Sequence, residues 1–378
     1  MTQLYIWQRT GWPRLHYRAA DLLERVGSAR RKQGELQASM RQLGFDEQAA
    51  SYLETLTTDA IETSEIEGEH LDYAAVRSSI AERLGMPDAA IAPTDSKAAG
   101  IAEMTVDATR NFADPLSQDR LFGWHKALFP DARSHGTTIT VGAWRKGAMG
   151  VCSRNRKDGT TITHFLAPPA DQVPTEMDRF LEWFAQSHDD GLLRSGLAHL
   201  WFVTIHPFDD GNGRTARAIA DMALAQDDRS PRRFFSVSRQ IRIEQQRYYE
   251  ILETTQKGDT DVTDWLNWFL QCYANAIENA QATISKALRG SRFWATHAGI
   301  SVNQRQRKVL NMLLDGYEGK LTSQRWSRLT GASRETAIRD IGELIAHKIL
   351  RQHGAARATH YELLEHGYAP EPSVDLTK

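Results

Sequence analysis

The chain contains one stretch of twelve residues that decides how the rest is interpreted, His206-Pro207-Phe208-Asp209-Asp210-Gly211-Asn212-Gly213-Arg214-Thr215-Ala216-Arg217. It brings together a base, an acid, two glycines, an amide and two arginines. Apolar residues recur at helical spacing on both sides of it. A hydrophobic core needs no such set of side chains, so we expect a functional site here.

The flanking residues predict how this stretch folds. A buried helix is expected to end near His206, because Pro207 cannot continue it and the residue before a proline is disfavoured in the α region. The helical pattern resumes at Ala218. Gly211-Asn212-Gly213 is therefore expected in a turn at a helix N-terminus, where Asn212 can cap the helix.

This turn has the properties of a phosphate site. Free N–H groups and the helix dipole favour an anion, and Arg214 and Arg217 lie on one face of the first turn as two guanidinium forks. Asp210 is a hard oxygen ligand of the kind that a phosphate-bound Mg²⁺ requires, and His206 can act as a general base. A proline helix stop, an ordinary glycine turn and an Arg217–Asp221 pair would each explain one feature without function, but their combination favours a site.

The twelve residues resemble the motif of the Fic family of nucleotidyltransferases, which reads HPF, any residue, Asp or Glu, GNGR, two residues, Arg. The chain matches every fixed position. The resemblance implies a mainly α-helical core with a β-hairpin flap. It also implies transfer of AMP from ATP to a Ser, Thr or Tyr hydroxyl of a target protein, with release of pyrophosphate. Doc-like members, which phosphorylate, have Lys where this chain has Gly213, so AMP transfer is favoured.

By the same resemblance, each residue of the motif has an expected role. His206 would deprotonate the target hydroxyl, Phe208 would anchor the loop in the core, and Asp210 would hold Mg²⁺. The expected catalytic residues are His206, Asp210 and Arg214. The residues expected to bind the ATP phosphates are Gly211, Asn212, Gly213, Arg214 and Arg217.

A second feature lies far upstream, at Thr63-Ser64-Glu65-Ile66-Glu67-Gly68. By itself it predicts an acidic helix end with a glycine C-cap. It also resembles the inhibitory motif of autoinhibited Fic proteins, carried here by Thr63, Glu67 and Gly68. The resemblance implies an N-terminal inhibitory helix whose Glu67 pairs with Arg217, the arginine that the γ-phosphate needs. Such a pair can carry roughly a few kcal/mol of coupling, and in related proteins the same glutamate supports the reverse reaction, removal of AMP from the target.

The segment between the two motifs predicts an exposed hairpin. Residues 138–141 and 161–165 alternate and are β-branched, and Asp158-Gly159 marks a tight turn. The hairpin resembles the family's flap, which holds a target segment by strand addition, with Met149, Gly150 and Val151 as its edge. A purely structural hairpin is the alternative, and residues 153–159 are longer and more basic than the family's pattern.

Two residues further along are candidates for the adenine pocket. Tyr249, in Arg247-Tyr248-Tyr249, and Gln256 resemble the segment that lines this pocket in the family. Ordinary packing of a helix face is the alternative for both.

The chain divides into three expected parts. Residues 1–96 are expected to be helical after an aromatic lead in which Trp7, Trp12 and Tyr17 pack on the rest. Residues 97–290 would form the catalytic domain, closed by a helix from about residue 263 to 288, and residues 291–378 would form a separate domain.

The last part resembles a winged helix-turn-helix. Helices are expected over residues 303–314 and 322–330, a third helix capped by Ser333 follows, and a hairpin over 349–363 breaks at Gly354. The third helix should turn five side chains inward, namely Ala337, Ile338, Ile341, Leu344 and Ile345. Residues 301–364 hold 11 Lys and Arg against 6 Asp and Glu, and four arginines could contact phosphates of nucleic acid: Arg334, Arg339, Arg351 and Arg357. A protein-protein or dimerisation module and a target-docking module are the alternatives.

Composition agrees with a globular enzyme. The 378 residues are 41% hydrophobic with a net charge of −2, so nothing drives the whole chain toward nucleic acid or membrane. Two cysteines, no run of about 18 apolar residues and a start without a signal-peptide pattern predict a cytoplasmic protein.

We therefore expect an autoinhibited protein adenylyltransferase that uses ATP and Mg²⁺. Its partner would be a target protein with an accessible hydroxyl, and a homodimer is plausible because related proteins self-associate. Two alternatives are a DNA-binding regulator whose Fic core senses nucleotide, and an enzyme that transfers another phosphate-containing group.

Overall fold

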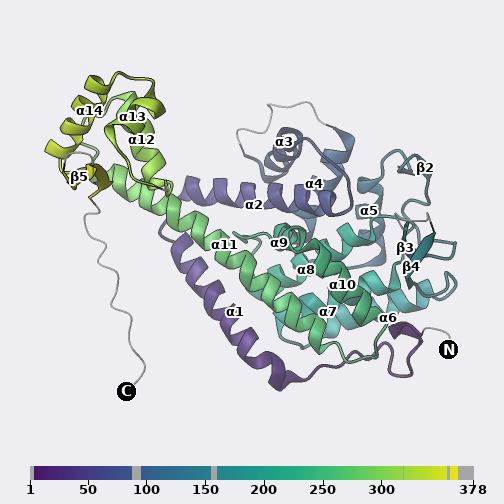
Figure 1. Ribbon diagram of the computed structural model, residues 1–378. Coiled ribbons are helices and arrows are strands. Elements are labelled where there is room, and N and C mark those ends of the chain that lie inside the picture. Colours follow the sequence, from purple (N-terminus) through teal and green to yellow (C-terminus); the bar gives the residue numbers. More distant parts are fainter. Residues whose placement is uncertain (1–3, 87–94, 155–159, 318, 356–357, 365–378) are drawn as a thin grey trace, which may run out of the picture. The chain divides into compact units, whose positions relative to one another are not determined.

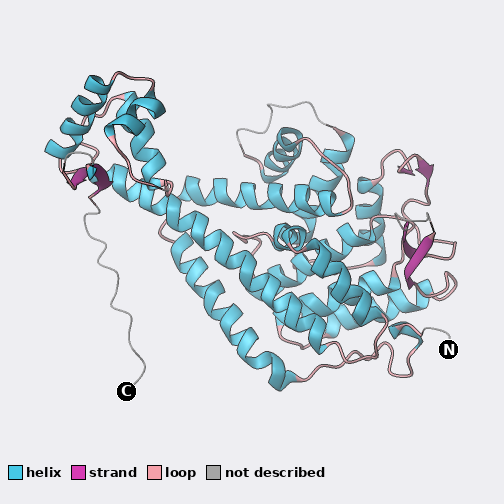
Figure 2. Ribbon diagram, in the orientation of Figure 1, coloured by secondary structure: helices cyan, strands magenta, loops and turns pink. Residues whose placement is uncertain are grey.

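The computed structural model describes residues 4–86, 95–154, 160–317, 319–355 and 358–364 (Figure 1). The chain divides into two compact units, Met1–Gln281 and Ala282–Lys378. Helices dominate both units, and the described strands form three two-stranded antiparallel sheets (Figure 2). The expected fold class, mainly α with small β-hairpins, is confirmed, whereas the domain boundaries at 96/97 and 290/291 stay predictions.

The first unit contains most of the helices. After a short 3₁₀ turn, Ile6–Gln8, it has α1 Ala19–Met40, α2 Phe45–Ile66, α3 Tyr73–Leu84, α4 Ser96–Arg110, α5 Gln118–Leu128, α6 Val173–Gln186, α7 Gly191–Ile205, α8 Asn212–Asp228, α9 Val237–Ile243 and α10 Gln245–Gln256. The helix expected to close this part, α11 Thr263–Thr296, begins where predicted and runs longer.

The centre of this unit is the pair α7 and α8, which pack along each other. Every residue of α7 except Arg194 is buried, which explains its nearly continuous apolar sequence. Aromatic rings fill the space around α7, and Phe202 and Phe208 are fully buried. The loop between α7 and α8, which carries the twelve-residue motif, therefore rests on a densely buried part of the first unit.

Helix α2 packs against α3, α4 and α9 and is held to α8 by buried charge. Arg233, in the loop before α9, pairs with Asp59 of α2 at 2.9 Å and with Asp221 of α8 at 2.8 Å. Ser236 also donates to Asp59. Burial raises the pKa of Asp59, and burial raises that of Asp221 to about 7. One buried cation thus joins the helix that carries Glu67 to the helix that carries the motif arginines.

The aromatic lead packs on the first unit as predicted. Trp7 donates its indole N–H to the Leu166 carbonyl at 2.7 Å, and Trp12 donates to Glu176 at 2.7 Å. Tyr17 donates its hydroxyl to Asp189 at 2.8 Å. These polar contacts and the burial around them strap the N-terminal segment across α6 and the base of a hairpin.

That hairpin pairs β3 Gly150–Arg154 with β4 Thr161–Leu166 and has an irregular register between Val151 and Cys152. The second strand is where the sequence predicts it, but the partnership expected of residues 138–141 is wrong. Residues 137 and 138 form β2, which pairs with β1 Arg133–Ser134, and the Thr140 N–H donates to Asp209 at 2.9 Å. This segment is therefore tied to the loop that carries the twelve-residue motif and not to the hairpin. Residues 155–159 of the expected tip lie outside the described residues.

The second unit has the element order predicted for it. Helices α12 Gln304–Leu314, α13 Ser323–Thr330 and α14 Arg334–Ala346 precede the hairpin β5 Leu350–His353 and β6 His360–Leu363. Ser333 caps α14 through the Thr336 N–H, Gly354 has a positive φ of 72°, and Leu321 forms an isolated antiparallel bridge with Tyr361 of β6.

One side chain of α14 departs from the prediction. Ile338, expected inward, is 52% exposed, because the face that packs on α12 and α13 comprises Ala337, Ile341 and Leu344 with Ile345 at its border. Arg357 lies outside the described residues. No helix among the described residues has the length and apolarity to cross a membrane.

Candidate active site

His206 ends α7 in a left-handed conformation, with φ 53° and ψ 57°. Its Nδ1 lies 3.1 Å from the Val203 carbonyl, and because a carbonyl only accepts, Nδ1 must carry the proton in this contact. The lone pair is therefore on Nε2. Burial lowers the pKa of His206, so the ring is neutral near pH 7 and Nε2 can accept a proton.

Two buried side chains hold the loop that follows. Phe208 stacks on His125 with ring centroids 4.1 Å apart. Asn212 accepts from the Phe208 N–H and donates to its carbonyl, both at 2.9 Å. The N-cap predicted at Asn212 is therefore wrong: Gly211, with φ 81°, is the N-cap, and Asn212 is the first residue of α8. Its amide is occupied by the loop, so it cannot cap the helix.

Arg145 holds the same loop through hydrogen bonds to its backbone carbonyls. It is 2% exposed, donates from Nε to the His206 carbonyl at 2.7 Å, and its backbone N–H donates to the Pro207 carbonyl at 2.9 Å. Buried carbonyls at this non-helical turn would otherwise lack partners. Arg145 thus fixes the peptide that carries the candidate base.

Asp210 lies at the other end of the turn, with its carboxylate facing Ser134. The Ser134 hydroxyl donates to Oδ2, and the Gly211 N–H donates to Oδ1 at 2.5 Å. The Asp210 carbonyl accepts from His125 Nε2 at 3.1 Å, while His125 Nδ1 accepts from the Gly142 N–H. Burial lowers the pKa of His125 to about 4, so it is a neutral structural support rather than a second base.

Arg217 is bound through Nε and Nη2 by residues at the end of α2. Its Nε donates to the Thr63 hydroxyl at 2.5 Å, and Nη2 donates to the Thr63 carbonyl at 3.0 Å and to Glu67 Oε1 at 2.7 Å. The i,i+4 pair with Asp221 does not form, since Asp221 pairs with Arg233. Glu67 also lies against Gly213, where an added Cβ would be 2.1 Å from Glu67 Oε1. The Glu67 carboxylate thus occupies the mouth of the glycine turn.

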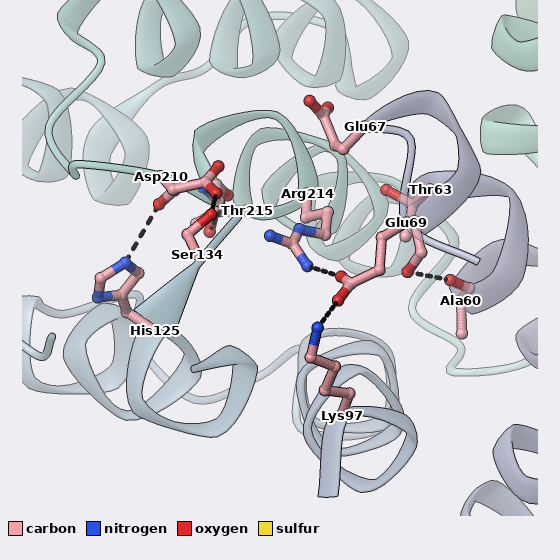
Figure 3. Close-up of polar contacts among 12 residues, drawn as sticks. Ala60, Thr63, Glu67, Glu69, Lys97, His125, Ser134, Asp210, Arg214 and Thr215 are labelled. Atoms are coloured by element: carbon pink, nitrogen blue, oxygen red, sulfur yellow. Dashed lines mark hydrogen bonds and ion pairs between the residues drawn. The ribbon is translucent and has the colours of Figure 1, made fainter. Parts of the chain in front are cut away.

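Arg214 has a different carboxylate partner. Its Nη1 pairs with Glu69 Oε2 at 2.5 Å, and Glu69 Oε1 pairs with Lys97 at 2.7 Å (Figure 3). The guanidinium lies over the Phe129 ring, 4.9 Å from its centroid.

Both motif arginines keep buried donors that nothing in the described part of the chain satisfies. Arg214 is 4% and Arg217 is 3% exposed, yet Nε of Arg214 and Nη1 of Arg217 have no hydrogen-bond partner among the described residues. Unsatisfied buried donors are costly. An anionic ligand with several oxygens would supply the missing acceptors.

A cleft of about 460 Å³ opens beside Arg214. Its lining includes four acids, namely Glu67, Glu69, Asp131 and Asp210, together with Arg214, Lys97 and the loop around Ser134. A cleft of this size fits part of a nucleotide. Among the described residues no three His, Cys, Asp or Glu side chains gather as metal ligands, but Mg²⁺ on a nucleotide needs few protein ligands because phosphates and waters supply the rest.

The remaining predicted site residues lie around this centre. Tyr249 is exposed and donates its hydroxyl to the Ile66 carbonyl at 3.1 Å, next to Glu67. Gln256 is 3% exposed and donates to Thr204 at 3.2 Å in the interior, so it lies in the core between α7 and α10. Met149 accepts from the Ala167 N–H at the base of the hairpin, and Val151 is exposed on β3. The assignments of these residues to the adenine pocket and the flap stay predictions.

The sequence did not point to several residues of this site. Glu69, Lys97, Ser134, His125 and Arg145 each contact the motif or its partners. They are single residues far from the motif in the chain, and only Glu69 had a signal, since it follows the inhibitory motif by one residue.

Comparisons with known proteins match different parts of the chain. A model of the Fic/DOC family matches residues 115–224, and a model described as a domain of unknown function, DUF4172, matches residues 5–86. A uridine 5'-monophosphate transferase of Xanthomonas campestris pv. campestris (strain 8004) is 30% identical over 148 residues, 36% of this chain and 26% of that protein. A protein adenylyltransferase Fic of Nematostella vectensis is 28% identical over 129 residues, 33% of this chain and 28% of that protein.

The similarity in sequence thus spans about a quarter of the length of these relatives. The similarity in fold is wider. The crystal structure of a Fic family protein from Desulfovibrio desulfuricans G20 superposes with a TM-score of 0.54 at 19% identity, over 93% of this chain and 98% of that one. The motif and the family match agree that residues 115–224 carry a Fic/DOC domain, and the helical core has the fold of a Fic family protein.

Proposed function

We propose that the protein transfers AMP from ATP to a hydroxyl side chain of a target protein, and that Glu67 keeps this activity low. The observation that carries the proposal is the pair of buried, unsatisfied arginine donors beside the glycine turn. They lie on the helix that begins six residues after His206, whose Nε2 is free of its proton. A phosphate-binding turn next to a neutral base is what a nucleotidyl transfer to a hydroxyl requires.

In this mechanism, each motif residue acts on one part of the reaction. The base at His206 accepts the proton of the target hydroxyl as its oxygen attacks the α-phosphorus. The first turn of α8, at Asn212 and Gly213, offers backbone N–H groups to the phosphates, and the helix dipole of α8 adds to the field there. Arg214 and Arg217 balance the charge that develops on the leaving pyrophosphate.

Mg²⁺ fits the donor set at Asp210. This carboxylate faces the cleft, and a hard oxygen ligand beside a phosphate turn is the usual protein contribution to a nucleotide-bound Mg²⁺. When bound, the ion would neutralise phosphate charge. The Ser134 hydroxyl and the Gly211 N–H hold the carboxylate in place.

Inhibition follows from where Glu67 lies. Its carboxylate covers Gly213 and binds Nη2 of Arg217, so a triphosphate would meet a negative charge at the turn and lose one arginine. Nearly complete burial of Arg217 strengthens this contact relative to a surface pair. Removal of AMP from a modified target, with Glu67 as a participant, is a second reaction that we assign to the same site as a proposal.

Two alternatives remain worth testing. The relative named as a uridine 5'-monophosphate transferase favours a direct comparison of nucleotides, because no contact to a base distinguishes adenine from uracil here. The second unit, with Arg334 and Arg339 on the exposed face of α14, favours a test of duplex binding by the full chain and by a chain without residues 291–378.

The decisive experiment uses α-labelled ATP with Mg²⁺ and a lysate as a source of targets. We compare wild type, Glu67→Gly, Glu67→Gly with His206→Ala, and Glu65→Ala as a matched control on the same turn of helix. Strong label with Glu67→Gly, weak label with wild type and Glu65→Ala, and none with the double variant would support the proposal. No label in any sample would overturn it, and stronger label from UTP than from ATP would replace AMP by UMP.

A further inference from the structure

Glu69 is placed by the tight turn that ends α2. Gly68 has a φ of 77°, and the Glu69 N–H donates to the Ser64 carbonyl at 3.0 Å while the Gly68 N–H donates to Glu65. This closure fixes the backbone of Glu69 relative to α2. Its side chain is then shared between two cations, Arg214 at 2.5 Å and Lys97 at 2.7 Å.

Two contacts fix the orientation of the Arg214 guanidinium, one with Phe129 and one with Glu69. Phe129 lies under it at 4.9 Å, and Glu69 takes only Nη1. Figure 3 shows Glu69 and Asp210 on opposite sides of this guanidinium. The nitrogen Nε is buried and has no partner among the described residues. Glu69 therefore binds one nitrogen of the guanidinium, Nη1, and leaves Nε available to a ligand.

Glu69 differs from Glu67 in this respect. Glu67 lies over Gly213, at the mouth of the phosphate turn, whereas the three atoms nearest to an added Cβ at Gly213 belong to Glu67 and Arg217 and not to Glu69. Lys97 also compensates the charge of Glu69, and the hydrogen bond to Glu69 raises the pKa of Lys97. Lys97, Glu69 and Arg214 together carry one positive charge, while Asp131 adds a negative charge near Lys97 at the edge of the same cleft. An anion is attracted to this group, while it is repelled by Glu67.

We propose that Glu69, supported by Lys97, is a positioning residue that orients Arg214 toward the β-phosphate of the bound nucleotide. This inference rests on the proposed function only for the identity of the nucleotide. The two carboxylates that follow α2 thus have opposite effects: Glu67 competes with the phosphates, and Glu69 prepares an arginine for them. A prepared arginine loses less conformational freedom when the ligand binds.

The test measures binding of AMP, ADP and ATP by calorimetry in the Glu67→Gly background. With Glu69→Ala, affinity for ADP and ATP is expected to fall about tenfold, the size of one charge-assisted hydrogen bond. Affinity for AMP, which has no β-phosphate, is expected to stay unchanged. Glu69→Gln retains an acceptor for Nη1 and is expected to restore most of the affinity, which also keeps the test valid if the alanine variant folds poorly.

Two controls separate orientation from general damage. Glu65→Ala removes the same charge one turn of backbone away, without contact to a motif arginine, and is expected to bind all three nucleotides as its parent does. In an Arg214→Ala background, Glu69→Ala is expected to have no further effect, because the arginine that it orients is absent.

Three results would overturn the inference. The first is tighter binding of ATP by Glu69→Ala, which would make Glu69 a second inhibitory acid. The second is an equal loss of affinity for AMP, which would make the role of Glu69 merely structural. The third is an undiminished loss of ADP and ATP affinity when Glu69→Ala is made in the Arg214→Ala background. Failure of the proposed function can be told apart from failure of this inference. If the Glu67→Gly protein binds nucleotides but labels no target, the proposed function fails, while the differences in nucleotide affinity can still be measured.

Discussion

Replacement of Arg233 by methionine is expected to destabilise the first unit far more than replacement of either of its acidic partners. Arg233 lies between Asp59 and Asp221, and all three side chains are nearly buried. Methionine retains much of the volume but removes the one cation that two carboxylates share. The change therefore tests whether α2 is held to α8 by charge or by packing.

The magnitude follows from what remains after each substitution. Without Arg233, two buried carboxyl groups have no counter-ion, and breaking a buried pair in this way costs about 3–5 kcal/mol. In Asp221→Asn, the one remaining carboxylate, Asp59, still has Arg233 as its counter-ion. The loss is then expected to stay below about 1.5 kcal/mol, the size of an ordinary hydrogen bond.

Dependence on pH gives a second signature. Burial raises the pKa of Asp221 to about 7 from 3.8, so in wild type its contribution to stability is present at low pH and is lost as pH rises toward 7. In Arg233→Met, both carboxyls fold in neutral form and their pKa values rise further. Each should then remove about 1.4 kcal/mol of stability per pH unit above pH 7, and Asp221→Asn should remove the part of the dependence below pH 7 that Asp221 causes.

Urea unfolding of the full chain, followed by tryptophan fluorescence at pH 6, 7 and 8, measures these differences. A matched control is Ser236→Ala, which removes one hydrogen bond to Asp59 and no charge. Equal destabilisation by Arg233→Met and Asp221→Asn would refute the reasoning. A penalty for Arg233→Met that does not grow between pH 7 and pH 8 would refute it as well.

Three further predictions concern packing and capping. Gly100→Ala is expected to destabilise the first unit by about 3 kcal/mol, because its Cβ would be 1.8 Å from the Ala127 carbonyl oxygen. Gly123→Ala, with no neighbour within 4 Å of its Cβ, is expected to stabilise α5 by about 0.5–1 kcal/mol. Thermal unfolding compares the two glycine variants, and similar melting temperatures for them would contradict both expectations. Ser333→Ala removes the cap of α14 and should cost about 1 kcal/mol, seen as faster amide hydrogen exchange in α14 that Ser333→Asp restores; unchanged exchange would contradict this.

The parts that the sequence predicted well depend on local chemistry. The end of α7 at His206, the cap at Ser333 and the break at Gly354 each follow from a residue's own backbone preference or from a side chain within three residues. The Glu67–Arg217 contact was also expected, since two recognisable motifs imply it, and it forms at 2.7 Å.

The parts that the sequence missed depend on partners far along the chain. Residues 138–141 have the β-branched pattern of a strand, but the pattern does not say that Asp209 binds the Thr140 N–H. The helical period of α14 does not decide that Ile338 lies just outside the packed face. Lys97 and Arg233 gave no signal, because a single cation on a polar segment is ordinarily solvated.

The strap at the N-terminus has a consequence for the hairpin. Trp7 takes the carbonyl of Leu166, and Tyr5 packs edge-on against Phe165, so the outer side of β4 is covered at its base. Glu253 binds His164 on the same strand at 2.8 Å. In the described part of the hairpin, β3 is then the side where backbone groups can meet another chain. If a peptide adds a strand to this hairpin, β3 is therefore the edge at which it would pair.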